Sequence, residues 1–226
     1  MKQVVVLTGA GISAESGINT FRDANGLWEG HDVMEVASPL GWNKNPETVL
    51  EFYNQRRRQL QEVEPNPAHF ALADLEKKFK VNIITQNVDD LHERAGSSRI
   101  LHLHGELLKV RSTFDPDLVL DWRKDLNPGD FCEHNHQLRP HIVWFGEEVP
   151  MFPVAFEITE KADILIIVGT SMQVYPAAAL LDYAKADAEI YFIDPNPSLR
   201  HRQDITVIDK KASVGVPQLV KELLRE

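Results

Sequence analysis

The stretch Val4-Val5-Val6-Leu7-Thr8-Gly9-Ala10-Gly11-Ile12-Ser13 decides the fold class. Its four apolar residues predict a buried strand, and its two glycines predict a tight turn that leads into a helix. Glycines let the backbone approach a ligand closely, and amides at the start of a helix favour a pyrophosphate group. The stretch therefore predicts the first strand and turn of an α/β domain, with a phosphate-containing ligand at the turn.

The spacing of these glycines differs from that of dehydrogenases. Gly17, the third glycine, lies outside the G-x-G-x-x-G pattern, and no acidic residue ends a second strand about 20 residues further on. Both departures argue against hydride transfer. A purely structural turn explains two glycines equally well, so ligand binding needs support from other segments.

Four further apolar runs are typical of buried parallel strands, namely Val81–Thr85, Ile164–Val168, Ile190–Ile193 and Ile205–Ile208. Helices are predicted between them. Asn45 and Asn66 can cap helices that begin at the prolines following them, and a last helix is expected from about Pro217. This alternation predicts a Rossmann-like parallel sheet that is covered by helices on both faces.

Two stretches interrupt the alternation. Residues 25–66 contain helices but no convincing strand, and residues 108–138 are polar and weakly periodic. We expect both stretches to leave the sheet and return to it. The chain of residues 1–226 is then one unit, with a large lobe of residues 1–24, 67–107 and 139–226 and a small lobe of residues 25–66 and 108–138.

The composition indicates a globular protein of the cytoplasm. Apolar residues make up 43% and charged residues 26% of the 226 residues. A net charge of −10 lacks the basic footprint of a nucleic-acid binder, and no apolar run is long enough for a membrane helix. The single Cys132 fits a reducing compartment, and we expect no signal peptide because the apolar stretch in residues 1–8 is short. We expect a monomer with no nucleic-acid or membrane partner.

Four other segments carry polar residues that are typical of a site. Gln86, Asn87 and Asp89 follow a predicted strand, and Gly169-Thr170-Ser171 ends another. His104 precedes a glycine, and Val143-Trp144-Phe145-Gly146 mixes aromatic and turn residues. Each segment alone is compatible with an ordinary turn or cap. Together they predict a site at the carboxyl edge of the sheet, where open α/β folds bind ligands.

In this order the motifs resemble the sirtuin family of NAD-dependent protein lysine deacylases, of the bacterial class III type, over nearly the whole chain. The matching motifs are Gly9–Ser13, Glu15–Ile18, Phe21-Arg22, Gln86–Asp89, His104-Gly105, Val143–Gly146 and Gly169–Ser171. The resemblance implies a Rossmann-like domain with a small lobe formed by two insertions, and an active site between the lobes.

The resemblance also implies which residues bind NAD, which is consumed as a co-substrate. They are Gly9, Ala10, Gly11, Ile12, Ser13, Phe21, Arg22, Gln86, Asn87, Asp89, Gly169, Thr170, Ser171, Asp194, Asn196 and Ala212. His104 would be the general base, and Asn87 would orient a water or the nicotinamide ribose. A histidine suits proton transfer near neutral pH. The expected products are free lysine, nicotinamide and 2′-O-acyl-ADP-ribose.

The acyl group is predicted from Tyr53 and Arg56, which are three residues apart and share one face of a predicted helix. In a generic helix such a pair is a core tyrosine beside a solvated arginine, and the run Arg56-Arg57-Arg58 is typical of a solvated face. The pair resembles the residues that bind the succinyl or malonyl carboxylate in class III sirtuins, in which a small residue matching Ala37 opens the acyl pocket. We expect desuccinylase and demalonylase activity, with deacetylation as well.

The substrate is expected to be an acylated protein or peptide. By resemblance its backbone would lie extended between the lobes, beside Val143, Phe145 and Gly146 and near residues 172–175. Such pairing is β-augmentation, in which backbone hydrogen bonds carry little sequence information. One enzyme of this kind can therefore serve many substrate proteins.

The small lobe departs from most sirtuins, which carry four zinc-binding cysteines. Residues 111–115 hold no cysteine, and only Cys132, near His134 and His136, stands in the second region. Structural zinc needs four ligands, so we expect no zinc and solvated histidines. We expect an apolar core of Phe114, Leu118, Leu120, Trp122, Phe131 and Leu138 instead. One equivalent of zinc in the purified protein would contradict this expectation.

Two other functions fit parts of the sequence. An NAD-dependent ADP-ribosyltransferase would use the same NAD site, but the intact Tyr53, Arg56 and peptide-binding motifs favour deacylation. A non-catalytic sensor of NAD or ADP-ribose would keep the glycine turn but would not need Asn87 and His104.

Overall fold

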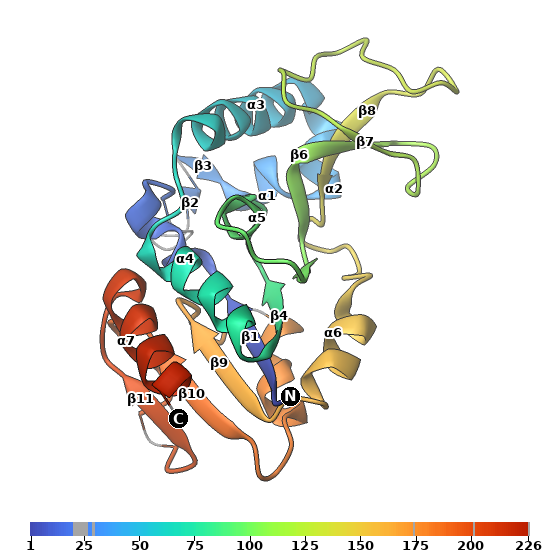
Figure 1. Ribbon diagram of the computed structural model, residues 1–226. Helices are drawn as coiled ribbons and strands as arrows, with labels where there is room; N and C mark the ends of the chain where they lie inside the picture. Colours follow the sequence, from blue (N-terminus) through green and yellow to red (C-terminus); the bar gives the residue numbers. More distant parts are fainter. Residues whose placement is uncertain (20–26, 29, 174, 201, 226) are drawn as a thin grey trace.

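The computed structural model describes residues 1–19, 27–28, 30–173, 175–200 and 202–225. Its largest element is a six-stranded sheet with the order β11-β10-β9-β1-β4-β5, in which all neighbouring strands are parallel (Figure 1). The strands are β1 (Gln3–Thr8), β4 (Lys80–Thr85), β5 (Ile100–His102), β9 (Ile164–Val168), β10 (Glu189–Ile193) and β11 (Ile205–Ile208). The predicted α/β fold and its five strands are confirmed, and β5 is an addition to them.

Two apolar layers cover the sheet. On one face α4 (Pro67–Asp74) and α7 (Ala212–Arg225) lie side by side, and Leu72, Leu219 and Val220 pack against the strands (Figure 1). On the other face α6 (Phe152–Thr159) and the 3-10 helix η4 (Ala177–Tyr183) bury a second cluster. The strand residues in both layers are almost completely excluded from water, which explains their continuous apolar runs.

The helix starts follow local capping chemistry. Asn45 accepts a hydrogen bond from the Thr48 amide at the start of α3 (Pro46–Glu62), as predicted. Asn66 caps α4 and completes a capping box with His69. The last helix is present as predicted, but its predicted start was wrong, because α7 begins at Ala212 and contains Pro217 in its interior.

The glycine turn leads into a helical segment, as predicted, which consists of two 3-10 helices, η1 (Ala10–Ile12) and η2 (Ala14–Ser16). A short helix, α5 (Leu91–Arg94), follows the end of β4, and a 3-10 turn, η3 (Leu75–Lys77), follows α4. The helices η1, η2 and α5 follow the carboxyl ends of β1 and β4, whereas η3 precedes the start of β4.

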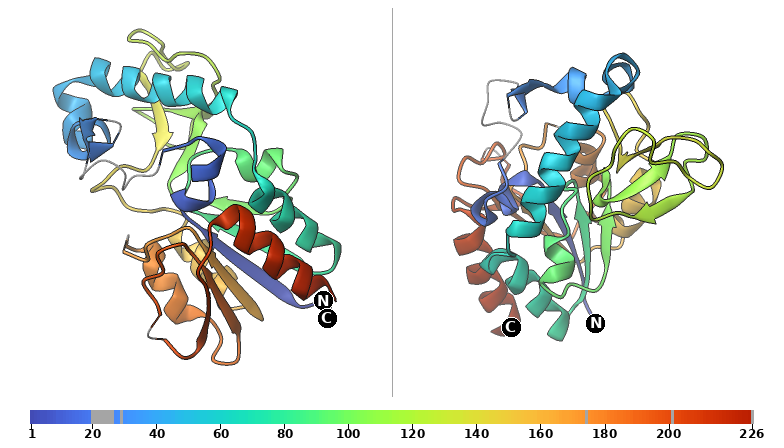
Figure 2. Two further views of the ribbon diagram at one scale, coloured as in Figure 1. Left: turned by 90° about the vertical axis from the view of Figure 1, so that its left-hand side faces the viewer. Right: turned by 90° about the horizontal axis from the view of Figure 1, so that it is seen from above.

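A second group of elements lies beyond the carboxyl edge of the sheet (Figures 1 and 2). It contains β2 (Leu27–Trp28), β3 (His31–Asp32), α1 (Val33–Val36), α2 (Pro39–Lys44), α3, β6 (Gly105–Ser112), β7 (Val119–Asp121) and β8 (Leu138–Ile142). Strands β7, β6 and β8 form an antiparallel sheet, and β2 pairs with β3. Residues 25–66 therefore contain two short strands that the sequence prediction lacked. The division into lobes remains a prediction, and β6 and β8 run across its expected boundaries.

The apolar core beneath α3 differs from the predicted one. Leu138 is buried, and Leu118 and Trp122 pack against it, as expected. Phe114 and Phe131 are instead 64% and 56% exposed, and Leu120 is also exposed. The core is completed by Leu50, Val110, Leu126 and Cys132. The prediction failed for these three residues because composition does not reveal which side of an irregular loop faces α3.

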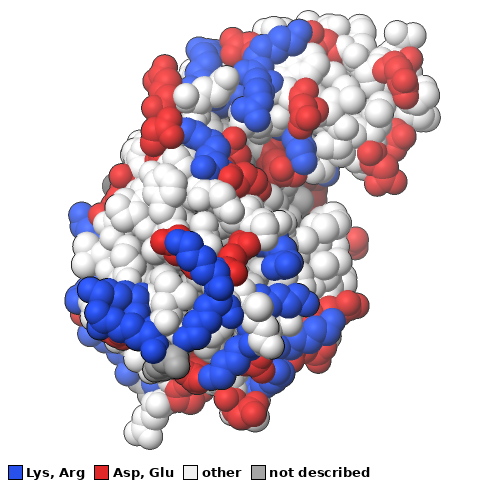
Figure 3. All heavy atoms as spheres, viewed as in Figure 1, with Lys and Arg blue, Asp and Glu red and all other residues white. Residues whose placement is uncertain are grey.

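Charged side chains of both signs are interspersed on the surface. On the face seen in Figure 3, Lys and Arg side chains lie beside Asp and Glu side chains over both parts of the molecule. None of the helices in the described ranges is long and apolar enough to span a membrane.

Candidate active site

A cleft of about 810 Å³ lies at the carboxyl ends of β1, β4 and β9 and extends to α3. Most of the predicted site residues line it, namely Gly9, Ala10, Gly11, Ser13, Ala37, Tyr53, Arg56, Gln86, Asn87, Asp89, His104, Val143, Phe145, Gly146, Gly169, Thr170, Ser171, Asp194, Asn196 and Ala212. Ile12 packs in the core beneath the cleft. Phe21 and Arg22 lie outside the described residues. The volume lies within the usual range for small-molecule sites.

The glycine turn is held against the loop after β9. The Gly9 amide donates to the carbonyl of Val168 at 3.0 Å, and the Gly11 amide donates to that of Gly169 at 2.9 Å. A Cβ on Gly11 would lie 2.7 Å from Cα of Gly169, closer than real contacts allow. The glycines are therefore required first by contact between two protein loops, a reason that the sequence prediction did not include.

Asn87 and Asp89 connect the end of β4 to this turn. The Asn87 Nδ2 donates to the Gly9 carbonyl at 3.2 Å and to Ser13 Oγ at 3.1 Å. Ser13 Oγ in turn donates to Asp89 Oδ2 at 2.9 Å. Burial raises the pKa of Asp89 to about 6, against the opposing effect of the Ser13 hydrogen bond. A buried carboxyl group that titrates near neutrality is a feature of functional sites.

His104 is placed as a proton acceptor. Its Nδ1 lies 3.0 Å from the carbonyl oxygen of Gln86. Because a carbonyl oxygen only accepts, the hydrogen between them belongs to Nδ1, and the neutral ring carries its lone pair on Nε2. Burial lowers the pKa of His104, partly offset by this hydrogen bond, and so favours the neutral ring at neutral pH.

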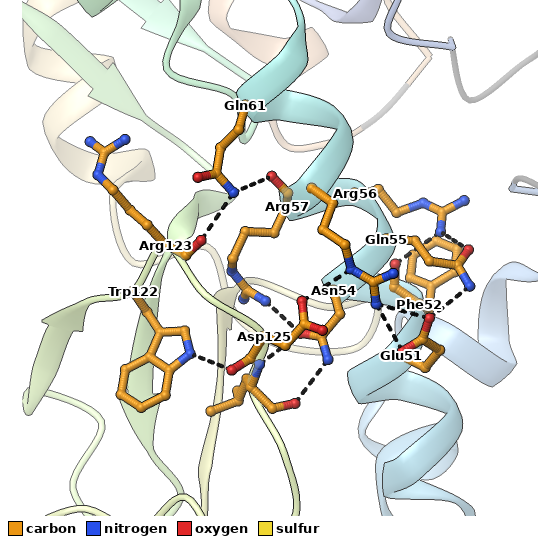
Figure 4. Close-up of polar contacts among 12 residues, drawn as sticks. Glu51, Phe52, Asn54, Gln55, Arg56, Arg57, Gln61, Trp122, Arg123 and Asp125 are labelled. Carbon is orange, nitrogen blue, oxygen red and sulfur yellow. Dashed lines mark hydrogen bonds and ion pairs between the residues drawn. The ribbon is translucent and has the colours of Figure 1, made fainter.

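Tyr53 and Arg56 lie at the α3 side of the same cleft. The Tyr53 hydroxyl accepts a hydrogen bond from Trp144 Nε1 at 3.0 Å, and burial raises the pKa of this phenol. The Arg56 guanidinium lies 3.8 Å from the centre of the Phe52 ring, and its Nη1 donates to the Phe52 carbonyl at 2.9 Å (Figure 4). The cleft thus carries a neutral hydroxyl and a cation at this end.

A neighbouring face of α3 binds the segment of residues 122–126 (Figure 4). Asn54 donates to the Leu126 carbonyl and accepts from its amide, at 3.0 and 2.8 Å. Arg57 is fully buried and donates to Asn54 and to the Leu107 carbonyl. The prediction of a solvated face was therefore wrong for Arg57, since an arginine run does not show which member the insertion covers.

Further residues line the cleft that sequence reasoning did not assign to the site. Trp28 and Leu60 add apolar surface, while Trp144 and Glu147 stand beside Tyr53. Trp144 and Glu147 belong to a segment whose unusual mix of aromatic and turn residues was the available signal. Glu15, which belongs to the matching motif Glu15–Ile18, also lines the cleft, as does Lys211, which no sequence pattern indicated.

A sequence profile of the Sir2 family matches residues 9–176, which is most of the chain. The chain belongs to the Sir2 family. A relative from Helicobacter pylori strain 26695, named NAD-dependent protein deacylase, is 64% identical over 99% of this chain and 98% of its own length. A relative of the same name from Bacteroides thetaiotaomicron is 56% identical, with the same coverage.

A solved structure agrees with these relatives. The complex of a Sir2 homologue with NAD superimposes with a TM-score of 0.90 at 40% identity, covering 99% of this chain and 90% of that one. This Sir2 chain is an NAD-dependent protein deacylase, and NAD is its co-substrate.

The cleft fits NAD on chemical grounds. The glycine turn and the loop after β9 pack against each other without side chains between them, and both line the cleft, so a pyrophosphate can approach the backbone of this turn closely. Gln86 Nε2 donates to Thr170 Oγ1 at 3.1 Å and ties the ends of β4 and β9 together beside this backbone. Asp194, Asn196 and Ala212 line the far end of the cleft, where polar and small residues suit a nucleoside.

The region where most sirtuins carry zinc-binding cysteines holds one cysteine, Cys132, in this Sir2 chain. Cys132 is buried, and its Sγ lies 3.3 Å from Ser112 Oγ. His134 and His136 are exposed, as expected, and the ring of Phe114 stacks on His136 at 4.4 Å. In the described ranges, no three His, Cys, Asp or Glu side chains come together as metal ligands would. The absence of zinc remains a prediction.

Proposed function

We propose that this Sir2 enzyme removes succinyl and malonyl groups, and also acetyl groups, from protein lysines, with release of nicotinamide and 2′-O-acyl-ADP-ribose. One observation carries the proposal. The guanidinium of Arg56 and the phenol of Tyr53 line the same cleft as His104.

The charge balance at this end of the cleft supports an anionic acyl group. A carboxylate that leaves water needs a cation and a hydrogen-bond donor in compensation, and an arginine with a phenol supplies both. The nearby carboxylate of Glu147 already bonds to Arg139 and Arg111, at 2.7 and 3.2 Å. Glu147 is therefore already paired with two other arginines, and Arg56 and Tyr53 are the groups at this end of the cleft that suit a ligand carboxylate.

The size of the pocket also supports a longer acyl group. Ala37 lines the cleft with a single methyl group, and its carbonyl accepts from the Phe145 amide at 2.9 Å. This bond fixes the alanine beside the segment that we propose to bind the peptide. A larger side chain at position 37 would occupy space that the acyl chain needs.

We assign the catalytic roles as follows. When bound, NAD supplies an electrophilic ribose carbon and nicotinamide as a leaving group. Nε2 of His104 would accept a proton from a ribose hydroxyl, and Asn87 would orient the nicotinamide ribose or a water. The glycine turn would bind the phosphates, with Phe21 and Arg22 beside them by family resemblance. Asp89 would hold the nicotinamide amide.

The remaining contacts are assigned by the same reasoning. Gln86 would contact the ribose, while Ser171, Asn196 and Ala212 would line the adenosine side. The peptide would pair with the backbone near Val143, Phe145 and Gly146. We also infer that the enzyme is cytoplasmic, because its one cysteine fits a reducing compartment. We further infer that it is a monomer.

The test incubates the wild-type enzyme with NAD and a succinyl-lysine peptide, and follows products by mass spectrometry. Acetyl-lysine and unmodified peptides are run in parallel. We expect nicotinamide, free lysine peptide and succinyl-ADP-ribose in equal amounts. ADP-ribose on protein would support a transferase, and binding of NAD without turnover of either acyl peptide would support a sensor. Turnover of the acetyl peptide alone would contradict the acyl assignment.

A further inference from the structure

The side chain of Tyr53 is held by a tryptophan that lies far from it in sequence. The indole Nε1 of Trp144 lies 3.0 Å from the Tyr53 hydroxyl oxygen, and both side chains are almost completely buried. The two rings are tilted at 31° with their centres 6.5 Å apart. The contact is thus a polar one made between two buried aromatic residues at the wall of the cleft.

This bond determines how the phenol can interact with a ligand. An indole N–H only donates, so the Tyr53 oxygen must accept from it. The hydroxyl hydrogen is then directed away from Trp144. Burial raises the pKa of Tyr53, which keeps this hydrogen on the oxygen at neutral pH. The phenol therefore stands as a donor, and a donor at this position matches an acceptor such as a carboxylate.

Trp144 is itself fixed by charged residues. The Arg139 guanidinium lies 3.3 Å from the centre of the indole ring, a close cation–π contact. The carboxylate of Glu147 accepts from the Trp144 amide at 2.8 Å and from Arg139 Nη1 at 2.7 Å. Trp42 packs nearby, with ring centres 5.7 Å apart. The indole is therefore restrained through both its ring and its backbone.

We propose that Trp144, restrained by Arg139 and Glu147, is a positioning residue for acyl selectivity. It orients the Tyr53 hydroxyl as a donor and so favours acyl groups that end in a carboxylate over neutral acyl groups. An acetyl group ends in a methyl group, which gains nothing from an oriented donor. This inference rests on the proposed desuccinylase function, and it names a determinant of selectivity that does not itself bind the carboxylate.

The test compares Trp144→Phe with wild type in the ratio of kcat/KM for succinyl-lysine to acetyl-lysine peptide. Phenylalanine keeps an aromatic ring for Arg139 but removes the N–H. We expect the ratio to fall about fivefold, the size of one ordinary hydrogen bond, mainly through a higher KM for the succinyl peptide. Trp42→Phe makes the same chemical change beside Trp144 and should leave the ratio within about twofold of wild type.

A double-mutant cycle separates positioning from general damage. In a Tyr53→Phe background, Trp144→Phe should cause no further fall in the ratio, because the oriented hydroxyl is already gone. Benzothienylalanine at position 144 keeps the indole shape without its N–H, and it should reproduce the fall even where Trp144→Phe folds poorly.

The inference would be overturned if a folded Trp144 variant kept the wild-type ratio of succinyl to acetyl kcat/KM. It would also be overturned if Trp144→Phe lowered this ratio as much in the Tyr53→Phe background as in wild type. Either result would leave the proposed function intact. A wild-type enzyme that does not turn over succinyl peptide would instead overturn the proposed function, and the inference with it.

Discussion

At the scale of single residues, Asp89 lowers the stability of the folded protein at neutral pH. The carboxyl group is buried, and its folded-state pKa is raised to about 6 from an ordinary value of 3.8. A raised pKa means that ionisation opposes folding. The stability contribution of the protonated group is complete below pH 3.8 and is lost as the pH rises through about 6. At neutral pH the folded protein therefore carries an unfavourable charge at this position.

Replacement of the Asp89 carboxyl group by an amide should stabilise the folded protein but lower its deacylase activity. We expect Asp89→Asn to raise the free energy of unfolding by roughly 1–3 kcal/mol at pH 7, since one pKa unit corresponds to about 1.4 kcal/mol. The gain should shrink toward pH 4, and deacylase activity should fall. Urea denaturation at the two pH values measures the effect, with the exposed Asp117→Asn as the control. A variant no more stable than wild type at pH 7 would contradict the expectation.

The same scale shows what sequence reasoning can and cannot find. It selected Asn87, Asp89 and His104 because polar residues after buried strands gather at one edge of a parallel sheet. It did not find the reason for Gly9 and Gly11, which depends on the distant Gly169 lying against them. A contact between segments so far apart leaves no local pattern.

At the scale of elements, α3 has two functional faces. One lines the cleft with Tyr53 and Arg56, and the other binds residues 122–126 through Asn54 and Arg57 (Figure 4). The second contact fixes the rotation of the helix and hence the direction of the first face. Hydrogen bonds thereby link residues 122–126 to the end of the cleft that we assign to the acyl group.

Asn54 is the residue on which this link depends. Its side chain exchanges two hydrogen bonds with Leu126 and accepts a third from Arg57 at 2.7 Å. Asn54→Ala leaves these buried groups without their partner, and we expect it to lower the free energy of unfolding by roughly 2–4 kcal/mol. Gln55→Ala, on the exposed side of the same helix, should change it by less than about 0.5 kcal/mol. Chemical denaturation measures both, and equal effects would contradict this role of Asn54.

The elements that sequence predicted best are the buried ones. Strands of a parallel sheet are apolar throughout, so β1, β4, β9, β10 and β11 were all found. Strands β2, β3 and β7 are only two or three residues long, too short for any periodicity to appear. The start of α7 was missed because the side chain that binds its first turn, Glu15, is 198 residues away in sequence. Glu15 accepts hydrogen bonds from both the amide and the hydroxyl of Ser213.

At the scale of the whole molecule, the cleft joins two kinds of chemistry. The edge of the parallel sheet supplies backbone and polar groups suited to NAD, and α3 supplies Tyr53 and Arg56, which we assign to the acyl group. The order of motifs along the chain was sufficient to predict the family and the co-substrate. The packing of the small antiparallel sheet was not predictable from it, because that region is irregular and its apolar residues show only weak periodicity.

The most direct test of the central claim removes the cation that we assign to the acyl carboxylate. Kinetics of wild type, Arg56→Met and Arg58→Met are compared on succinyl-lysine and acetyl-lysine peptides. Arg58 lies on the same helix, bonds to Glu51 and Asp125, and does not line the cleft. We expect Arg56→Met to lower kcat/KM for the succinyl peptide about 10- to 100-fold, as for the loss of a charged hydrogen bond, and Arg58→Met to leave it within about twofold. An Arg56→Met enzyme with unchanged kcat/KM for the succinyl peptide would contradict the account.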